Sequence, residues 1–183
     1  SLIGIPGLFK CWLKKNVGIV NAIGTGVADD KVVYSYVNKM IVYYLGEQPA
    51  LNQVETYLCH DKIQRDYVLE NMSKLVVKPA NASGGYGIMI GPKASTKERE
   101  EVAQKIKKNP REYIAQPLET LSTAPTITEK NIEPRHLDLR PFVLSGKTSY
   151  VTTGGLTRVA LRKGSTIVNS SQGGGSKDTL IVE

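Results

Sequence analysis

The chain has few of the residues that metal, disulfide and nucleic-acid sites use. Its 183 residues include two cysteines, Cys11 and Cys59, and two histidines, which give no metal-ligand spacing and no disulfide framework. Two Phe and one Trp, with nine scattered Tyr, provide no aromatic platform on which bases could stack. No apolar run approaches the length of a membrane span, and no signal peptide is visible at the start. We therefore expect a cytoplasmic protein with reduced cysteines and no membrane partner.

What the chain has in excess is positive charge, with a formal net charge of +7. Such a charge fits phosphates, nucleic acid or another acidic partner. Much of this positive charge comes from one short helical region, whose basic residues are best interpreted as a solvated helix face. These residues are Lys93, Lys97, Arg99, Lys105, Lys107, Lys108 and Arg111. A nucleic-acid binder rests on charge alone, so we expect no nucleic-acid partner.

The hydrophobic pattern predicts an α+β chain without repeats. Residues 1–28 are typical of short strands and loops, and residues 119–134 of a loop. Predicted helices run from Asp29 or Asp30 to about Leu45, from Asp61 onward, and from a capping box at 95–98 to about Lys108. Predicted strands are 75–78, 86–90, 113–117, 135–144, 148–153, a further strand after Gly154-Gly155, and 165–169. The tail 170–177 is expected to be mobile unless a ligand orders it.

The stretch 76–88 indicates a phosphate-binding hairpin. An apolar strand ends in Lys78, and a small-residue loop with Ser83, Gly84, Gly85 and Gly87 follows. Glycines allow the backbone to approach a ligand closely, successive N–H groups can bind an anion, and a lysine adds a compact cation. The spacing is not that of the P-loop. Two alternatives stay open: Lys78 pairs with a nearby carboxylate, or the loop is a flexible hairpin without a ligand.

Later strands carry further candidates. Asp138 and Arg140 share one face of strand 135–144, where flanking leucines predict that the opposite face is buried, and Arg158 lies on the following strand. Either arginine can hold phosphate oxygens through its planar guanidinium, although Asp138 and Arg140 can also be a simple surface pair. Asp138 and Asn169 are weak candidates for metal ligands; Asn169 can equally make a local turn bond.

Several long motifs resemble one family. They are Pro6-Gly7-Leu8-Phe9, residues 21–31, Tyr43-Tyr44-Leu45-Gly46-Glu47, and residues 76–88, 113–117, 135–142, 154–160 and 169–178. Across nearly its whole length the chain resembles the circularly permuted ATP-grasp proteins, often described as similar to glutathionylspermidine synthase.

The resemblance implies a nucleotide cleft formed by antiparallel sheets with flanking helices, and ATP with Mg²⁺ as cofactors. It implies that Lys31 and Lys78 lie near the phosphates, and that 83–87 is a lid loop. Gln116 would lie where a hinge strand meets adenine, with Ile114, Ala115 and Leu118 nearby. Arg140 and Arg158 would be phosphate or acyl-phosphate partners. Three parts are expected: a partial core with helices (1–74), a lid subdomain (75–118), and core strands with a Gly-rich tail (119–183).

The implied activity is the joining of a small-molecule or peptide carboxylate to an amine through an acyl phosphate. The family's magnesium ligands lie in a segment upstream of the matched region, which this sequence does not contain. We therefore expect a C-terminal portion of a longer ligase that is inactive alone and works with the upstream remainder of the same protein. The alternative is a non-catalytic nucleotide-binding module.

Overall fold

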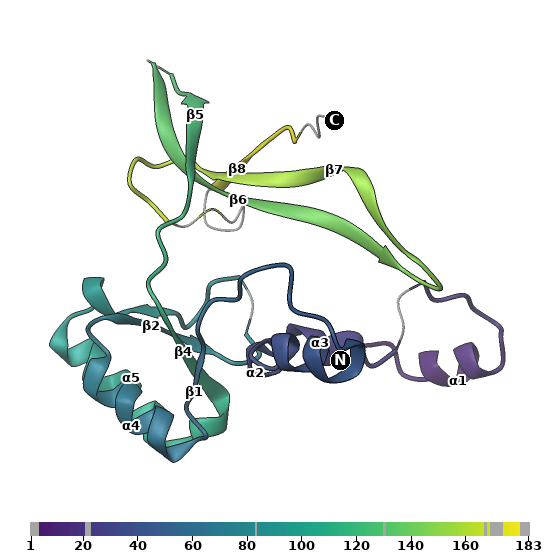
Figure 1. The fold of residues 1–183 in the computed structure, drawn as a ribbon, viewed down its shortest axis with the longest axis horizontal. Helices are drawn as coiled ribbons and strands as arrows, with labels where there is room; N and C mark the ends of the chain where they lie inside the picture. Colours follow the sequence, from purple (N-terminus) through teal and green to yellow (C-terminus); the bar gives the residue numbers. More distant parts are fainter. Residues whose placement is uncertain are drawn as a thin grey trace.

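The computed structural model describes residues 4–20, 23–82, 84–129, 131–166, 168 and 174–179. It confirms the α+β prediction, with two antiparallel four-stranded sheets of strand order β1-β4-β2-β3 and β5-β6-β7-β8. The two sheets lie in separate layers joined by the segment that follows β4 (Figure 1). Among the described residues there is no helix with the length and apolar character needed to cross a membrane.

The first sheet contains β1 (Tyr57–Leu58), β2 (Leu75–Pro79), β3 (Met89–Ile90) and β4 (Tyr113–Pro117). Helices α4 (Lys62–Asn71) and α5 (Thr96–Lys108) cover one of its faces (Figure 1). Both helix starts follow from local sequence. Asp61 accepts a hydrogen bond from the Gln64 N–H at 2.9 Å, and Ser95 and Glu98 form the predicted capping box. Two short 3-10 turns, Gly91–Lys93 and Pro110–Glu112, flank α5.

Side-chain alternation gives this sheet two different faces. Val77 and Ala115 point toward α4 and α5, where they form a fully buried core with Val68 and Ile106. The neighbours Ile114 and Leu58 face the opposite way and pack with Ala80 and with Val32 of α2 (Lys31–Tyr34). Lys78 and Gln116 have the same strand parity as Ile114, so they emerge on this second face. The first sheet contains residues from both sides of position 74, the expected boundary between the first two parts. The three-part division stays a prediction.

The hairpin predicted at 75–78 and 86–90 forms, but its second strand is shorter than expected. Only Met89–Ile90 pairs with β2. Gly84, Gly85 and Gly87 have φ of +69°, +78° and +72°. Positive φ is incompatible with an extended strand and is adopted readily only by glycine, so the loop extends through position 87.

The N-terminal part is more helical than predicted. Instead of short strands, the described residues form α1 (Leu8–Leu13) and a 3-10 turn at Thr25–Asp29. The single helix expected to reach Leu45 is two helices, α2 and α3 (Val37–Leu45). The Ser35 hydroxyl donates to the Val32 carbonyl at 2.7 Å, a local bond of the kind that competes with helix continuation. Gly46 ends α3 with φ +68°, as predicted.

The second sheet contains β5 (Thr123–Ile127), β6 (Ile132–Ser145), β7 (Ser149–Ala160) and β8 (Gly174–Lys177). The loop predicted over 119–134 is therefore wrong, because β5 pairs with β6 and its Pro125 lies opposite Pro134. Prolines misled the prediction: β5 is an edge strand, where a missing N–H is tolerated.

Three further expectations for this sheet fail. Gly154 and Gly155 do not separate two strands but lie within β7, where a Cβ on Gly155 would approach the Arg140 carbonyl to 3.0 Å. No strand forms at the described residues 165, 166 and 168, whereas positions 174–177, expected to be mobile, pair with β7. On the face of β6 opposite Asp138, Leu137 is only partly buried and Leu139 is 59% exposed, so the two leucines beside Asp138 are not buried as predicted.

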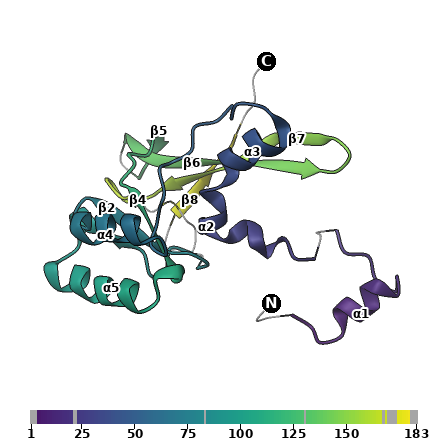
Figure 2. The same cartoon turned by 60° about the horizontal axis from the view of Figure 1, so that its bottom comes forward.

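The outer parts of the fold project away from its sheets. Helix α1 lies apart from both sheets in two views (Figures 1 and 2). The β6–β7 strands continue as a long two-stranded hairpin beyond the pairing with β5 and β8. The register of β6 and β7 shifts between Pro141 and Val143, where Phe142 of β6 faces residues 152–154 of β7, so the extra residues of this irregularity lie on β7.

Candidate functional site

Two lysine ammonium groups lie near each other on the second face of the first sheet, opposite α4 and α5, which we call the inner face. Lys31 begins α2, and its Nζ donates to the carbonyl oxygens of Pro79 at 3.0 Å and Ala82 at 2.6 Å. Lys78 lies on β2, and its Nζ donates to Oε1 of Gln116 at 2.6 Å. Lys31 also donates its backbone N–H to the Ala80 carbonyl at 2.9 Å, which fixes α2 against the end of β2. The structure thus brings together two residues that are 47 positions apart in the sequence.

Both ammonium groups are held in an environment that disfavours their charge. Burial lowers the pKa of Lys78, and the nearby charge of Lys31 lowers it further. Burial also lowers the pKa of Lys31, against the opposing effect of Asp30 and Asp29. Within the part of the chain that the structure describes, neither lysine forms an ion pair with a carboxylate. The alternative in which Lys78 pairs with a carboxylate is therefore not found there. An anion bound beside the two lysines would stabilise their charged forms.

Gln116 fixes Lys78 and is itself fixed by Thr56. The Gln116 side chain is only 8% exposed, and its Nε2 donates to Thr56 Oγ1 at 2.9 Å. Thr56 Oγ1 in turn donates to the Val54 carbonyl at 3.0 Å. This chain of bonds sets which end of the amide faces Lys78. Gln116 was expected beside adenine; the structure shows it bound to Lys78, while Leu118, 40% exposed, follows the end of β4.

The glycine loop lies directly after these contacts. Pro79 and Ala82, whose carbonyls hold Lys31, lead into it. Gly87 has φ +72°, and a Cβ at that position would lie 2.9 Å from Pro79 Cγ, so the turn returns close to its own start. Ser83 lies outside the described residues. Gly84, Gly85 and Gly87 all have positive φ, a backbone that is adopted readily only by glycine. Their role toward a ligand stays a prediction.

Asp138, Arg140 and Arg158 are on adjacent strands of the second sheet. Asp138 lies opposite Arg158 in the β6–β7 register, and the two form a bidentate pair in which Arg158 Nε donates to Oδ1 at 2.9 Å. Arg158 lowers the pKa of Asp138, and Asp138 raises that of Arg158. Arg140 Nε is 3.9 Å from the same carboxylate, with the Arg140 side chain 53% exposed. Arg158 is thus already neutralised, and Arg140 is the freer guanidinium.

The described residues do not form a magnesium site. Across the described ranges, no three His, Cys, Asp or Glu side chains group together as metal ligands. Asp138 is bonded to Arg158 and close to Arg140, an environment that repels a cation. Asn169, the other weak candidate, is outside the described residues. The residues at hand fit a phosphate and do not fit Mg²⁺.

Sequence reasoning missed two supports of this site. Thr56 is a single threonine in an irregular segment and gives no sequence signal. Asp30 accepts the Val32 N–H at 2.8 Å as the cap of α2, and Arg111 donates to its other oxygen at 2.6 Å. This contact ties the start of α2, and therefore Lys31, to the segment before β4. Only the capping role of Asp30 could be read from the sequence.

Comparison with known families decides the identity of the fold. Residues 1–160 match the model of the circularly permuted ATP-grasp family, type 2. The chain belongs to this family. The resemblance seen in the sequence motifs is thereby confirmed, including the family's fold class.

The relatives of this ATP-grasp chain are longer proteins. It is 56% identical over its whole length to an uncharacterized protein of Synechocystis sp., of which it covers 38%. It is 52% identical to an uncharacterized protein of Mycobacterium tuberculosis, covering 33% of it. It is also 51% identical over 98% of its length to a Frankia casuarinae protein named "Putative glutamate–cysteine ligase 2-2", of which it covers 21%. The chain thus spans about a fifth to two-fifths of these relatives.

Proposed function

We propose that this chain is the ATP-holding portion of a longer ATP-dependent ligase that joins a carboxylate to an amine. The observation that carries the proposal is the pair Lys31 and Lys78: two half-buried ammonium groups with lowered pKa values and no carboxylate partner among the described residues. Like charges placed close together in a partly desolvated site are costly. A polyphosphate removes that cost by supplying the opposite charge.

Each proposed role follows from a position in the site. Lys31 and Lys78 bind phosphate oxygens, and the backbone of Ser83, Gly84, Gly85 and Gly87 closes over them. Gln116 positions Lys78, to which it is bonded at 2.6 Å. The segment after β4, with Leu118, provides an apolar contact for the base. Membership of the circularly permuted ATP-grasp family supports ATP as the ligand.

The proposed chemistry proceeds through an acyl phosphate. A carboxylate oxygen attacks the γ-phosphorus of ATP, the bond to the bridging oxygen breaks, and ADP leaves. The amine then attacks the acyl carbon, the C–O bond to phosphate breaks, and an amide, phosphate and a proton are formed. Positioning and neutralisation of charge lower both barriers. Arg140 is the arginine more available for this, because Arg158 is bonded to Asp138.

Magnesium and the substrates belong to the longer protein. When bound, Mg²⁺ would neutralise phosphate charge, and the described residues contain no cluster of three His, Cys, Asp or Glu side chains that would hold it. The relative named as a glutamate–cysteine ligase suggests an amino acid or short peptide as the acid and an amino acid as the amine. A cytoplasmic location, as expected from the sequence, would supply ATP.

The test is ATP-dependent phosphate release by the longer protein, with amino acids supplied as acid and amine. Lys78→Ala is expected to abolish release and to weaken ATP binding, whereas Lys107→Ala, an exposed lysine on α5, is expected to leave both unchanged. Normal turnover in Lys78→Ala would refute the role of Lys78. ATP protection against heat unfolding without product, for any acid and amine, would instead favour the non-catalytic binding module.

A further inference from the structure

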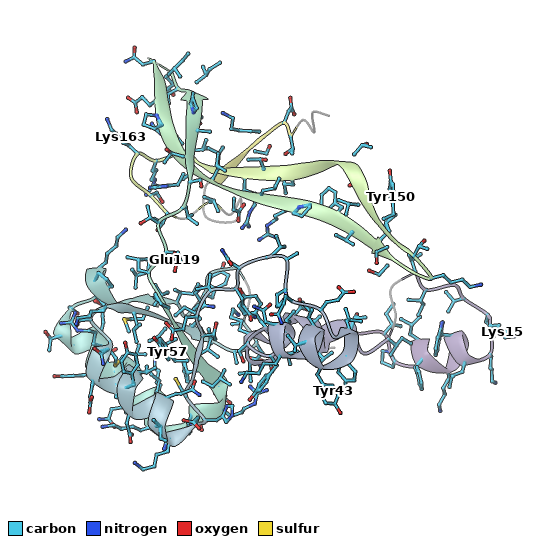
Figure 3. The ribbon with its side chains drawn as sticks, viewed as in Figure 1. Lys15, Tyr43, Tyr57, Glu119, Tyr150 and Lys163 are labelled. Carbon is cyan, nitrogen blue, oxygen red and sulfur yellow. The ribbon has the colours of Figure 1, made fainter. Side chains whose placement is uncertain are left out.

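Helix α3 has apolar residues on every side and buries none of them. Its sequence from Val37 to Leu45 includes Met40, Val42, Tyr43 and Tyr44, and no residue of the helix is buried. Tyr43 and Tyr44 are 81% and 75% exposed. Figure 3 shows Tyr43 pointing away from the rest of the chain. A helix that is apolar all round belongs in a protein interior, so α3 lacks the surface that should cover it.

The same lack of cover extends through the N-terminal part. In the described part of residues 4–56, Val32 is the only buried residue. Helix α1 also buries nothing, although it carries Phe9 and Trp12, whose stacked rings are 5.8 Å apart. An open hollow of about 550 Å³ beside α3 is lined by Val42, Tyr43 and Pro49 among others. Exposed apolar surface of this extent marks an interaction site.

The outer β6–β7 hairpin is uncovered on both faces. Leu144 lies opposite Tyr150 on one face, and Val143 lies opposite Val151 on the other. All four side chains are more than half exposed, and Tyr150 stands out from β7 in Figure 3. Strands that are apolar on both faces are buried on both faces. The hairpin therefore needs protein on two sides.

We propose that α1, α3 and the outer β6–β7 hairpin are the surface on which the rest of the longer polypeptide packs. The relatives support this occupant, because each carries this stretch together with at least as much further chain: the stretch is 38% of one and 33% of another. A segment of the same polypeptide is present at high effective concentration and needs no charge complementarity to dock. The apolar character of these surfaces resembles a domain core cut in half, as in permanent interfaces. The proposal does not depend on ATP.

Tyrosine nitration of the longer protein tests this directly. The native protein, without nucleotide, is treated with tetranitromethane, and each tyrosine is quantified by peptide mass mapping against the same protein unfolded in denaturant. The expected result is loss of nitration at Tyr43, Tyr44 and Tyr150 in the native state. Tyr86, 70% exposed on the glycine loop, is the control that stays reactive. Alkylation of Cys11, exposed on α1, is expected to be lost in parallel.

Two outcomes overturn the proposal. Nitration of Tyr43 and Tyr44 at the rate of the unfolded protein would show that the rest of the polypeptide leaves α3 uncovered. If protection is lost when the protein is diluted to a monomer, as measured by light scattering, a second copy of the protein covers the surface instead. Loss of ATP turnover in Lys78→Ala with unprotected tyrosines would leave the proposed function intact and remove only this surface.

Discussion

Lys78 and Gln116 join the two central strands of the first sheet, with Nζ of the lysine 2.6 Å from Oε1 of the amide. The bond crosses diagonally between β2 and β4, because Lys78 pairs in register with Ile114 and Gln116 with Val76. The ammonium is thus held at a fixed point on the inner face, with its remaining N–H bonds available to a ligand. Its position depends on a neutral acceptor that adds no negative charge to compete with phosphate.

Replacing Gln116 by leucine is expected to weaken ATP binding by the longer protein about tenfold or more. The variant leaves the half-buried ammonium of Lys78 without its acceptor, and a hydrogen bond to a charged group is worth about 1.5–3 kcal/mol. Isothermal titration calorimetry measures the change.

Thr56 provides the matched test of this relay. Thr56→Val frees the Gln116 amide to rotate and is expected to reduce affinity by a smaller factor, while Thr56→Ser keeps the hydroxyl and restores it. If Gln116→Leu binds ATP as the natural protein does, Lys78 does not need this anchor and the relay has no role.

Replacing Lys78 by methionine is expected to stabilise the longer protein at neutral pH while weakening ATP binding. Burial holds the native pKa of Lys78 below its ordinary value of 10.5. Between the lowered pKa and the ordinary one, the unfolded chain binds more protons, so the stability of the natural protein rises with pH. The advantage of Lys78→Met is therefore largest below the lowered pKa and shrinks as pH rises toward 10.5. Urea unfolding midpoints at a series of pH values measure it, with Lys107→Met as the unaffected control. An advantage that does not vary with pH would contradict the assigned cause.

Replacing Asp138 by asparagine is expected to cost about 1–2 kcal/mol of unfolding free energy at neutral pH, since Arg158, only 17% exposed, loses a charged bidentate acceptor. The native pKa of Asp138 is lowered below 3.8, so this stability is complete above that value and is lost as pH falls through the native pKa. The difference in unfolding free energy between the natural protein and Asp138→Asn should accordingly become smaller in acid. Asp66→Asn breaks the exposed pair with Lys62 and is expected to change little. Equal costs for the two substitutions would argue against a special role for the Asp138–Arg158 pair.

Replacing Gly91 by alanine is expected to destabilise the first sheet by several kcal/mol. A Cβ there would lie 1.8 Å from the Met72 carbonyl oxygen and 2.5 Å from that of Leu75, so the backbone joining α4 to β2 would have to shift. Overpacking of a tight core costs about 1–3 kcal/mol, and more where backbone must move. Gly154→Ala in β7, with nothing within 4 Å of the added carbon, is the control expected to be nearly neutral. Thermal unfolding compares the two, and similar melting temperatures would show that the α4–β2 connection yields easily.

The features predicted correctly from the sequence are those fixed by neighbouring residues. Asp61 and the Ser95–Glu98 box cap their helices through bonds that span three positions, and the strand 113–117 forms with the predicted bounds. The small-residue loop predicted after Lys78 also forms, with positive φ at Gly84, Gly85 and Gly87. Each of these features depends on residues close together in the chain, so the sequence pattern predicts it.

The errors concern features that depend on distant partners. Strand β5 exists because it pairs with β6, and its proline gave no local sign of a strand. The neutralisation of Arg158 by Asp138 follows from a register between residues 20 positions apart. The contact of Lys78 with Gln116 spans 38 positions, so the sequence could nominate both residues but not join them. The exposure of Leu139 was mispredicted because strand alternation does not reveal whether another layer is present.

Lys31 can link a bound anion to the start of the glycine loop. Its ammonium holds the carbonyls of Pro79 and Ala82 at the entrance of the glycine loop, and its backbone N–H holds Ala80. These two bonds use two of the three ammonium N–H groups, so a phosphate can bind through the third while both carbonyls stay bound. A bound anion and the first residues of the loop would then share one side chain, and a nucleotide lacking the phosphate that Lys31 reaches would leave the loop without that link.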